Sequence, residues 1–235
     1  MTQVLWSAII IIATNIAYLL PALLACSLRV YDVAAAHFAV FLASNAHHVC
    51  FDLAKSCYPA LRTALQHLDV TIAYYSVARD IMFVASYDII QVKGRSKIVR
   101  HTYTDFATVL YDAIIVFAVF YFGNSLTASM LVVGYGLLVI GSALTFYWNM
   151  KKQTFKQRFN WVFIGLAVLS GVVGSLLFVF EDEIGRPFHS LWHIFGALTS
   201  HLLLLGSSNH IKRKGLGYFG CLFARQEDTD FAPRG

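Results

Sequence analysis

The sequence predicts an all-α membrane protein: a bundle of seven transmembrane helices with its N-terminus outside and its C-terminus in the cytoplasm. Hydrophobic residues make up 58% of the 235 positions and charged residues only 13%, where about 25% charged is usual in soluble domains. Seven apolar stretches are close to the roughly 20 residues that one membrane crossing requires. The loops between them alternate in positive charge. Together these observations argue against a soluble enzyme.

Short polar segments separate the predicted spans, and Gly123-Asn124-Ser125 is one that favours a tight turn. In chain order the spans are Val4–Leu28, Ala34–Leu53, Val70–Ile90, Phe106–Phe122, Leu126–Trp148, Asn160–Phe180 and Pro187–Gly206. We therefore expect residues 1–208 to form one seven-helix membrane domain. Residues 209–235 mix charge, glycine and proline, which predicts a partly disordered cytoplasmic tail.

Basic residues are concentrated after the odd-numbered spans. They are Arg29 after the first; Lys93, Arg95, Lys97 and Arg100 after the third; Lys151, Lys152, Lys156 and Arg158 after the fifth; and Lys212, Arg213 and Lys214 after the seventh. Because cytoplasmic loops are enriched in Lys and Arg, this pattern places the N-terminus outside. Anionic inner-leaflet lipids then account for the net charge of +5, so no nucleic-acid partner is expected.

Three histidines in distant parts of the chain are predicted to lie at one depth near the outer face. His48 is close to the outer end of span two, and His189 and His193 are at the start of span seven. The last two are four residues apart, so they share a helix face and can reach one ion. Three protein ligands with a fourth position open to water is the arrangement of a catalytic zinc site.

Two further polar residues complete the predicted site. Asp69 is at the outer start of span three, at a depth where it can accept a hydrogen bond from a water molecule or act as a base. Ser44 is one turn before His48 on the same face, where it could hold that water, a ligand or a developing oxyanion. We therefore predict Asp69 and Ser44 as catalytic residues.

Simpler interpretations remain open for each piece. An HxxxH pair in a membrane helix is more often a pair of hydrogen-bonding residues between helices, and His47 or His48 taken alone is typical of an interfacial polar residue. It is the shared depth of all three histidines that favours a metal. Arg79 and Asp80 lie in the middle of span three, where an unpaired charge is costly. For these two we favour an interior ion pair or network over catalysis.

The cysteines agree with this topology. Cys50 at the outer end of span two and Cys57 in the next loop both face an oxidising compartment, so a disulfide between them is predicted. It would brace the helix that carries His48. Cys221 follows a basic stretch near the C-terminus, where palmitoylation and an unmodified thiol are both open.

The order of these residues resembles a known superfamily of membrane proteins. Seven spans with Ser44-xxx-His48, an Asp at the start of span three and His189-xxx-His193 in span seven are similar to the CREST superfamily, which contains alkaline ceramidases, progestin and adipoQ receptors and GPI-anchor remodelling enzymes. The resemblance implies a zinc ion bound by His48, His189 and His193, with Asp69 and Ser44 nearby. Several members hydrolyse amide or ester bonds of lipids.

Shorter motifs resemble one branch of that superfamily, which contains myomaker and its GPI-phospholipase relatives. These motifs are "HHVC" with a second cysteine a few residues on, "YYSV" in span three, and "FVFEDE" leading into "FHSLWH". The resemblance implies a multi-pass plasma-membrane protein that promotes myoblast fusion and acts on outer-leaflet lipid. A homodimer and a small membrane fusion partner are both left open. The alternative is a zinc-dependent lipid amide or ester hydrolase of the ceramidase or phospholipase kind.

Overall fold

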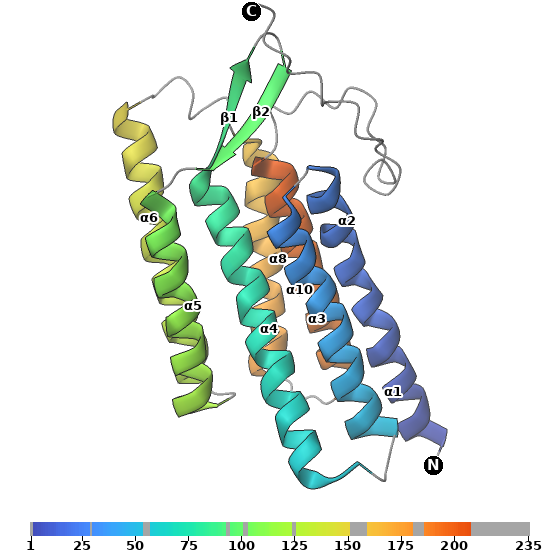
Figure 1. The fold of residues 1–235 in the computed structure, drawn as a ribbon. Helices are drawn as coiled ribbons and strands as arrows, with labels where there is room; N and C mark the ends of the chain where they lie inside the picture. Colours follow the sequence, from blue (N-terminus) through green and yellow to red (C-terminus); the bar gives the residue numbers. More distant parts are fainter. Residues whose placement is uncertain are drawn as a thin grey trace, which may run out of the picture.

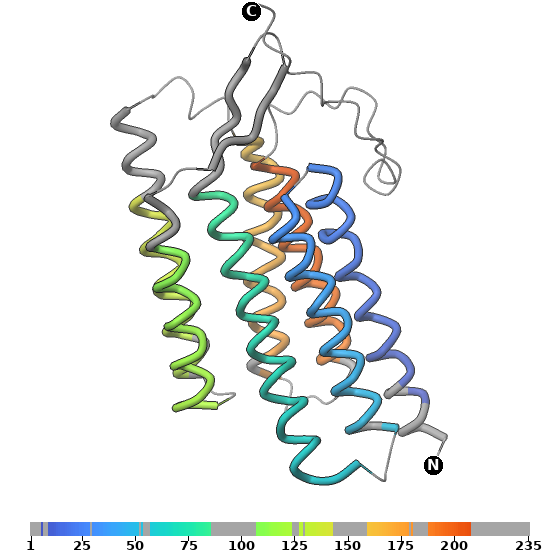
Figure 2. The backbone as a smooth tube through the Cα atoms, in the orientation of Figure 1, coloured from blue at the N-terminus to red at the C-terminus, as the bar shows by residue number. Residues whose placement is uncertain are grey.

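The computed structural model describes residues 2–28, 30–53, 57–92, 95–100, 103–123, 126–150, 159–180 and 186–207 (Figure 1). Figure 2 traces the backbone alone in the same orientation. The predicted tail, 209–235, with Cys221, lies outside the described residues. So do many of the loop charges from which the orientation was predicted, including Arg29, Lys151 and Lys212. The orientation therefore stays a prediction.

The described chain forms one bundle of helices that run alternately up and down (Figure 1). The helices are α1 (Thr2–Thr14), η1 (Asn15–Tyr18), α2 (Leu19–Ser27), α3 (Tyr31–His48), η2 (Val49–Leu53), α4 (Pro59–Ser86), α5 (Tyr103–Phe122), α6 (Leu126–Met150), α8 (Trp161–Val179) and α10 (Arg186–Ser207). Because α1, η1 and α2 follow one another as a single pass, each predicted span corresponds to one helical pass. The predicted helical class is confirmed.

The third predicted span differs from the structure at both ends. Helix α4 begins at Pro59, well before Val70, and ends at Ser86. The last predicted residues of the span instead belong to β1 (Tyr87–Val92), which pairs antiparallel with β2 (Arg95–Arg100). These two segments are rich in isoleucine and valine and are separated by two positions, a pattern that favours a hairpin over a helix. The predicted third span therefore extended too far at its C-terminal end, although the all-α class holds.

The first pass is interrupted near its middle by the 3₁₀ turn η1. Pro21 has no N–H to donate to the carbonyl of Ala17, and its ring crowds that carbonyl. The turn tightens just before the proline, and Tyr18 at its end is buried in the bundle. This local irregularity places an aromatic ring between helices α3 and α10.

Two of the three apolar clusters in the described bundle each join three or more helices, and the third contains Tyr18, Val40 and Ala197. One joins α4, α5 and α6 through Met82, Tyr111 and Val132, and the Tyr111 hydroxyl donates to the Val132 carbonyl at 2.9 Å. The other joins α2, α3, α4 and α10; its members include Leu24, Val33, Phe83 and Leu204. Helix α10 is thus anchored at its C-terminal half, away from the predicted histidine site.

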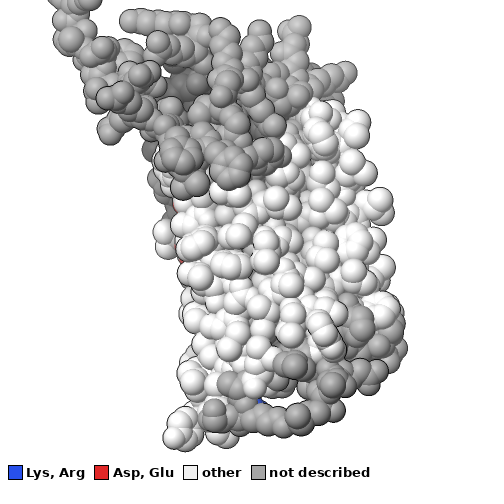
Figure 3. Space-filling model, turned by 90° about the vertical axis from the view of Figure 1, so that its right-hand side faces the viewer, with Lys and Arg blue, Asp and Glu red and all other residues white. Residues whose placement is uncertain are grey.

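The outside of the bundle is apolar. Large side chains that point outward include Phe120, Val162 and Leu138, each more than two-thirds exposed. On the face shown in Figure 3 the described surface has almost no Lys, Arg, Asp or Glu side chains. Within the described residues, two helical segments are long and apolar enough to cross a membrane by length and composition, Ile9–Ser27 and Trp161–Phe178.

Candidate metal centre

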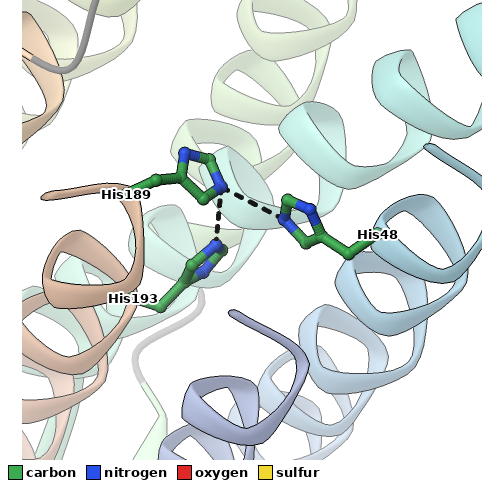
Figure 4. A group of neighbouring side chains, drawn as sticks. All are labelled: His48, His189 and His193. Carbon is green, nitrogen blue, oxygen red and sulfur yellow. Dashed lines mark hydrogen bonds between the residues drawn. The ribbon is translucent and has the colours of Figure 1, made fainter. Parts of the chain in front are cut away.

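The three predicted histidines converge in space. His48 is the last residue of α3, and His189 and His193 lie one turn apart near the start of α10. The Nε2 atom of His189 is 3.1 Å from that of His48 and 3.0 Å from that of His193 (Figure 4). His48 and His193 are buried and His189 is half-buried. The predicted convergence of segments 141 residues apart is confirmed.

Facing nitrogens of this kind suit a cation. A neutral imidazole has one N–H and one acceptor nitrogen, so three Nε2 atoms directed at one another cannot all form good hydrogen bonds among themselves. A cation between them would accept a lone pair from each. These three residues form a group that could hold a metal ion, because all their ligand atoms lie within 4.8 Å of one another.

A second group overlaps the first. His47, His48 and Asp69 also have ligand atoms within 4.8 Å of one another, and Asp69 reaches the site from α4. The structure therefore places the predicted Asp69 beside the histidines. His47 was not predicted as part of the site, although it is buried here. The "HH" pair in the sequence is the signal that could have indicated it.

Ser44 lies one helical turn before His48 and is fully buried, next to Asp69. Its hydroxyl is close enough to the Asp69 carboxylate to interact with it. The position is consistent with a hydroxyl that serves a bound water molecule or ligand.

The chain just after His48 departs from regular α-helix. Val49–Leu53 forms the π turn η2, and turns of this type are frequent at functional sites. Within it, Cys50 forms a disulfide with Cys57, as predicted. The disulfide ties the end of α3 to the segment that leads into α4. It therefore connects the element that carries His48 to the helix that carries Asp69.

Two aromatic rings enclose the α10 histidines. Trp192 contacts His193 with ring centroids 4.7 Å apart, and Tyr18 meets His193 edge-on at 6.1 Å. The Nδ1 atom of His193 is buried and has no partner in the described part of the chain. Metal-bound histidines usually donate this second N–H to an acceptor. A water molecule or a ligand would have to supply that acceptor.

The two mid-span charges of α4 are each paired with a different helix. Asp80 accepts a hydrogen bond from His37 Nε2 at 2.9 Å, and both residues are fully buried. Arg79 donates to Asp112 on α5 at 2.6 Å and stacks over the Tyr75 ring. The predicted interior network is confirmed. Its partners His37 and Asp112 were not predicted.

A cavity of about 560 Å³ lies between α4, α6, α8 and α10. Its lining includes Val70 and Trp192, the sequence neighbours of Asp69 and His193, but none of the site residues themselves. It continues along α4 to Asp80 and along α10 to Leu203. Most of the lining is apolar. The helices that carry Asp69 and the α10 histidines thus also line an apolar cavity of the kind that binds small molecules.

No family model matches the chain, and no curated protein is significantly similar to it. The resemblance to the CREST superfamily therefore depends on the motif residues and their arrangement.

Proposed function

We propose that the chain is a multi-pass plasma-membrane protein of the CREST type that binds zinc near the outer membrane face and acts on a lipid. The apolar outer surface supports the membrane location, because large side chains such as Phe120 and Val162 would contact hydrocarbon rather than water. The alternating helical passes and the basic loops support seven spans with the N-terminus outside.

Zinc is the metal that the donor set fits best. In a tetrahedral site with Zn–N bonds near 2.0–2.1 Å, ligand nitrogens are about 3.3 Å apart. The Nε2 separations of 3.0 and 3.1 Å among His48, His189 and His193 are close to this value. Three imidazoles with no thiolate are typical of catalytic zinc sites that keep a fourth position open.

The reaction that the site supports best is hydrolysis of a lipid ester or amide. Zinc, when bound, supplies an acidified water molecule and polarises a carbonyl group. Asp69 is placed to accept a proton and return it to the leaving group, as a general base and then a general acid. The buried hydroxyl of Ser44 would donate to the developing oxyanion. The apolar cavity would hold the lipid chain.

One observation carries this proposal: three imidazole nitrogens face one another beside a carboxylate, on helices that also line an apolar cavity.

A second candidate function is membrane fusion of the myomaker kind. The observation that favours it is the amino-acid sequence of the motifs. The segments "HHVC" and "FVFEDE" followed by "FHSLWH" resemble that branch more than the ceramidases. In this case the zinc site would shape a cavity for outer-leaflet lipid. A homodimer or a small membrane fusion partner would provide the assembly.

The hydrolase proposal is tested with purified full-length protein. We expect stoichiometric zinc and release of fatty acid from a panel of ceramides and phospholipids. His193→Ala should lose both, whereas His67→Ala, an exposed histidine on α4, should retain both. Product release that is unchanged in His193→Ala would contradict the mechanism.

The fusion proposal is tested by expressing the chain on fusion-competent cells and counting multinucleate cells. Fusion by the wild type with no lipid hydrolysis would favour the second function. Fusion that persists in His193→Ala would show that the metal has no part in it. Absence of fusion in the native cell type would reject this candidate.

A further inference from the structure

The three helices that form the histidine site carry a second polar layer deeper in the bundle. On each helix, a polar residue lies eleven positions from a residue of the site. The pairs are His48 and His37 on α3, Asp69 and Asp80 on α4, and His189 and Ser200 on α10. Eleven residues are close to three turns, so the same helix faces are used, about 16 Å further along the axis. The residues of this layer are His37, Asp80 and Ser200, all buried.

This second layer differs from the histidine site in its chemistry. His37 donates to Asp80 Oδ1 at 2.9 Å, so the histidine already has an anionic partner and no cation is required. Within the described part of the chain, Asp80 receives its hydrogen bond from His37 alone. Its Oδ2 atom is left for another donor.

Asp80 also lines the cavity, and it is the one charged residue among the described residues that do so. Ser76 is one turn earlier on α4, and Ser200 is on α10; both hydroxyls belong to the same lining. The part of the lining around Asp80 is therefore polar, while most of the remaining lining is apolar. Tyr18 connects the two layers, because its ring stacks on His37 and meets His193 edge-on.

The distance between the two ends matches a lipid chain. From Val70 to Asp80 the cavity follows α4 for about 15 Å, which is half of the roughly 30 Å hydrocarbon core of a bilayer and thus the depth of one leaflet. An unsubstituted chain that filled this length would place methylene groups against the Asp80 carboxylate. Covering a charge with hydrocarbon is unfavourable.

We propose that the Asp80 end of the cavity binds a hydroxyl group carried on the far part of the lipid's acyl chain. The site then selects hydroxylated chains over unsubstituted ones. Asp80 Oδ2 accepts from the hydroxyl, and Ser76 and Ser200 are placed beside it. A hydroxyl fits better than an ammonium group, because a charged group would lose far more hydration on entering the hydrocarbon. This inference depends on the proposed lipid-binding function and specifies its substrate class.

The experiment measures binding of fatty acids to the full chain in detergent micelles by competition with a fluorescent fatty acid. The probes are palmitic acid and hydroxypalmitic acids with the hydroxyl in the near, middle or far third of the chain. We expect the far-third isomer to bind at least about tenfold more tightly than palmitic acid. A tenfold ratio of dissociation constants corresponds to the weak end of the free energies measured for hydrogen bonds to charged groups. The near-third isomer should show no gain.

Two double variants locate the effect. His37→Phe with Asp80→Leu replaces both partners by apolar groups, so neither is left buried alone, and it should remove the preference for hydroxylated chains. Arg79→Leu with Asp112→Leu removes the other polar pair of α4, which does not line the cavity, and should leave the preference unchanged. Retained zinc content shows that each variant is folded.

The outcomes separate this inference from the proposed function. Tight binding of all the fatty acids with no preference would overturn the inference and leave the lipid cavity intact, with water filling its polar end. A preference that survives in the His37→Phe, Asp80→Leu variant would also overturn it. If no fatty acid binds the wild type, the proposed function fails and the inference fails with it.

Discussion

Histidines are used in two different ways in this bundle, and the contrast between the two regions explains what each requires. In the layer formed by His48, His189 and His193, called the outer layer, the rings face one another through Nε2. In the layer formed by His37, Asp80 and Ser200, called the inner layer, His37 faces the carboxylate of Asp80. The inner pair is held together by a charge-assisted hydrogen bond, whereas the outer group brings three ligand nitrogens together and could hold a metal ion. Histidine thus indicates a metal site when three or more ligand atoms converge, and a single histidine–carboxylate pair does not.

The largest expected effect follows from removing one outer ligand. In His48→Ala the two remaining imidazoles provide too few ligands for a stable three-histidine site, so purified protein should lose stoichiometric zinc. Metal content measured by atomic emission tests this. The matched control is His37→Gln, in the inner layer, which should keep its zinc. Equal zinc in wild type and His48→Ala would remove the distinction between the layers.

The next effect is on stability. His37→Ala leaves the Asp80 carboxylate buried without its partner, and breaking a buried pair in this way costs about 3–5 kcal/mol. We expect a fall of that size in the free energy of unfolding, measured in mixed micelles. The double variant His37→Phe, Asp80→Leu should recover most of the loss. A single variant as stable as the wild type would show that Asp80 is neutral in the folded protein.

A smaller effect is expected for the disulfide between Cys50 and Cys57. In the chain-entropy model a loop this short contributes about 2 kcal/mol. Because the disulfide holds the end of α3 next to α4, the variant with both cysteines replaced by serine should also bind zinc more weakly, by up to about tenfold. Zinc titration measures this. The inner layer lies three turns away, so the hydroxyl preference of the cavity should not change.

The smallest effect is expected at the other polar pair. Asp112 is 37% exposed, so its ion pair with the buried Arg79 is partly screened. Asp112→Ala should cost about 1–2 kcal/mol, because Arg79 keeps its contact with Tyr75. Comparing this variant with His37→Ala in the same unfolding measurement tests whether burial decides the cost. A larger loss at Asp112 would contradict that explanation.

Much of the fold could be predicted from local sequence. The apolar stretches predicted all the helical passes, and the i, i+4 spacing of His189 and His193 placed both rings on one face. The disulfide followed from the predicted side of the membrane. The hairpin at Tyr87–Arg100 was missed, because a short run of isoleucine and valine next to a helix is ambiguous between strand and span.

Helical periodicity and hydropathy are properties of neighbouring residues, so the sequence by itself determined the helical passes, the apolar exterior and the faces on which polar residues lie. Only the tertiary structure decided that His37 partners Asp80, that Arg79 partners Asp112, and that Asp80 lines a largely apolar cavity. These pairings depend on which helices pack together and at what height. The paired residues are more than thirty positions apart in the sequence, so no local sequence pattern indicates that they are in contact.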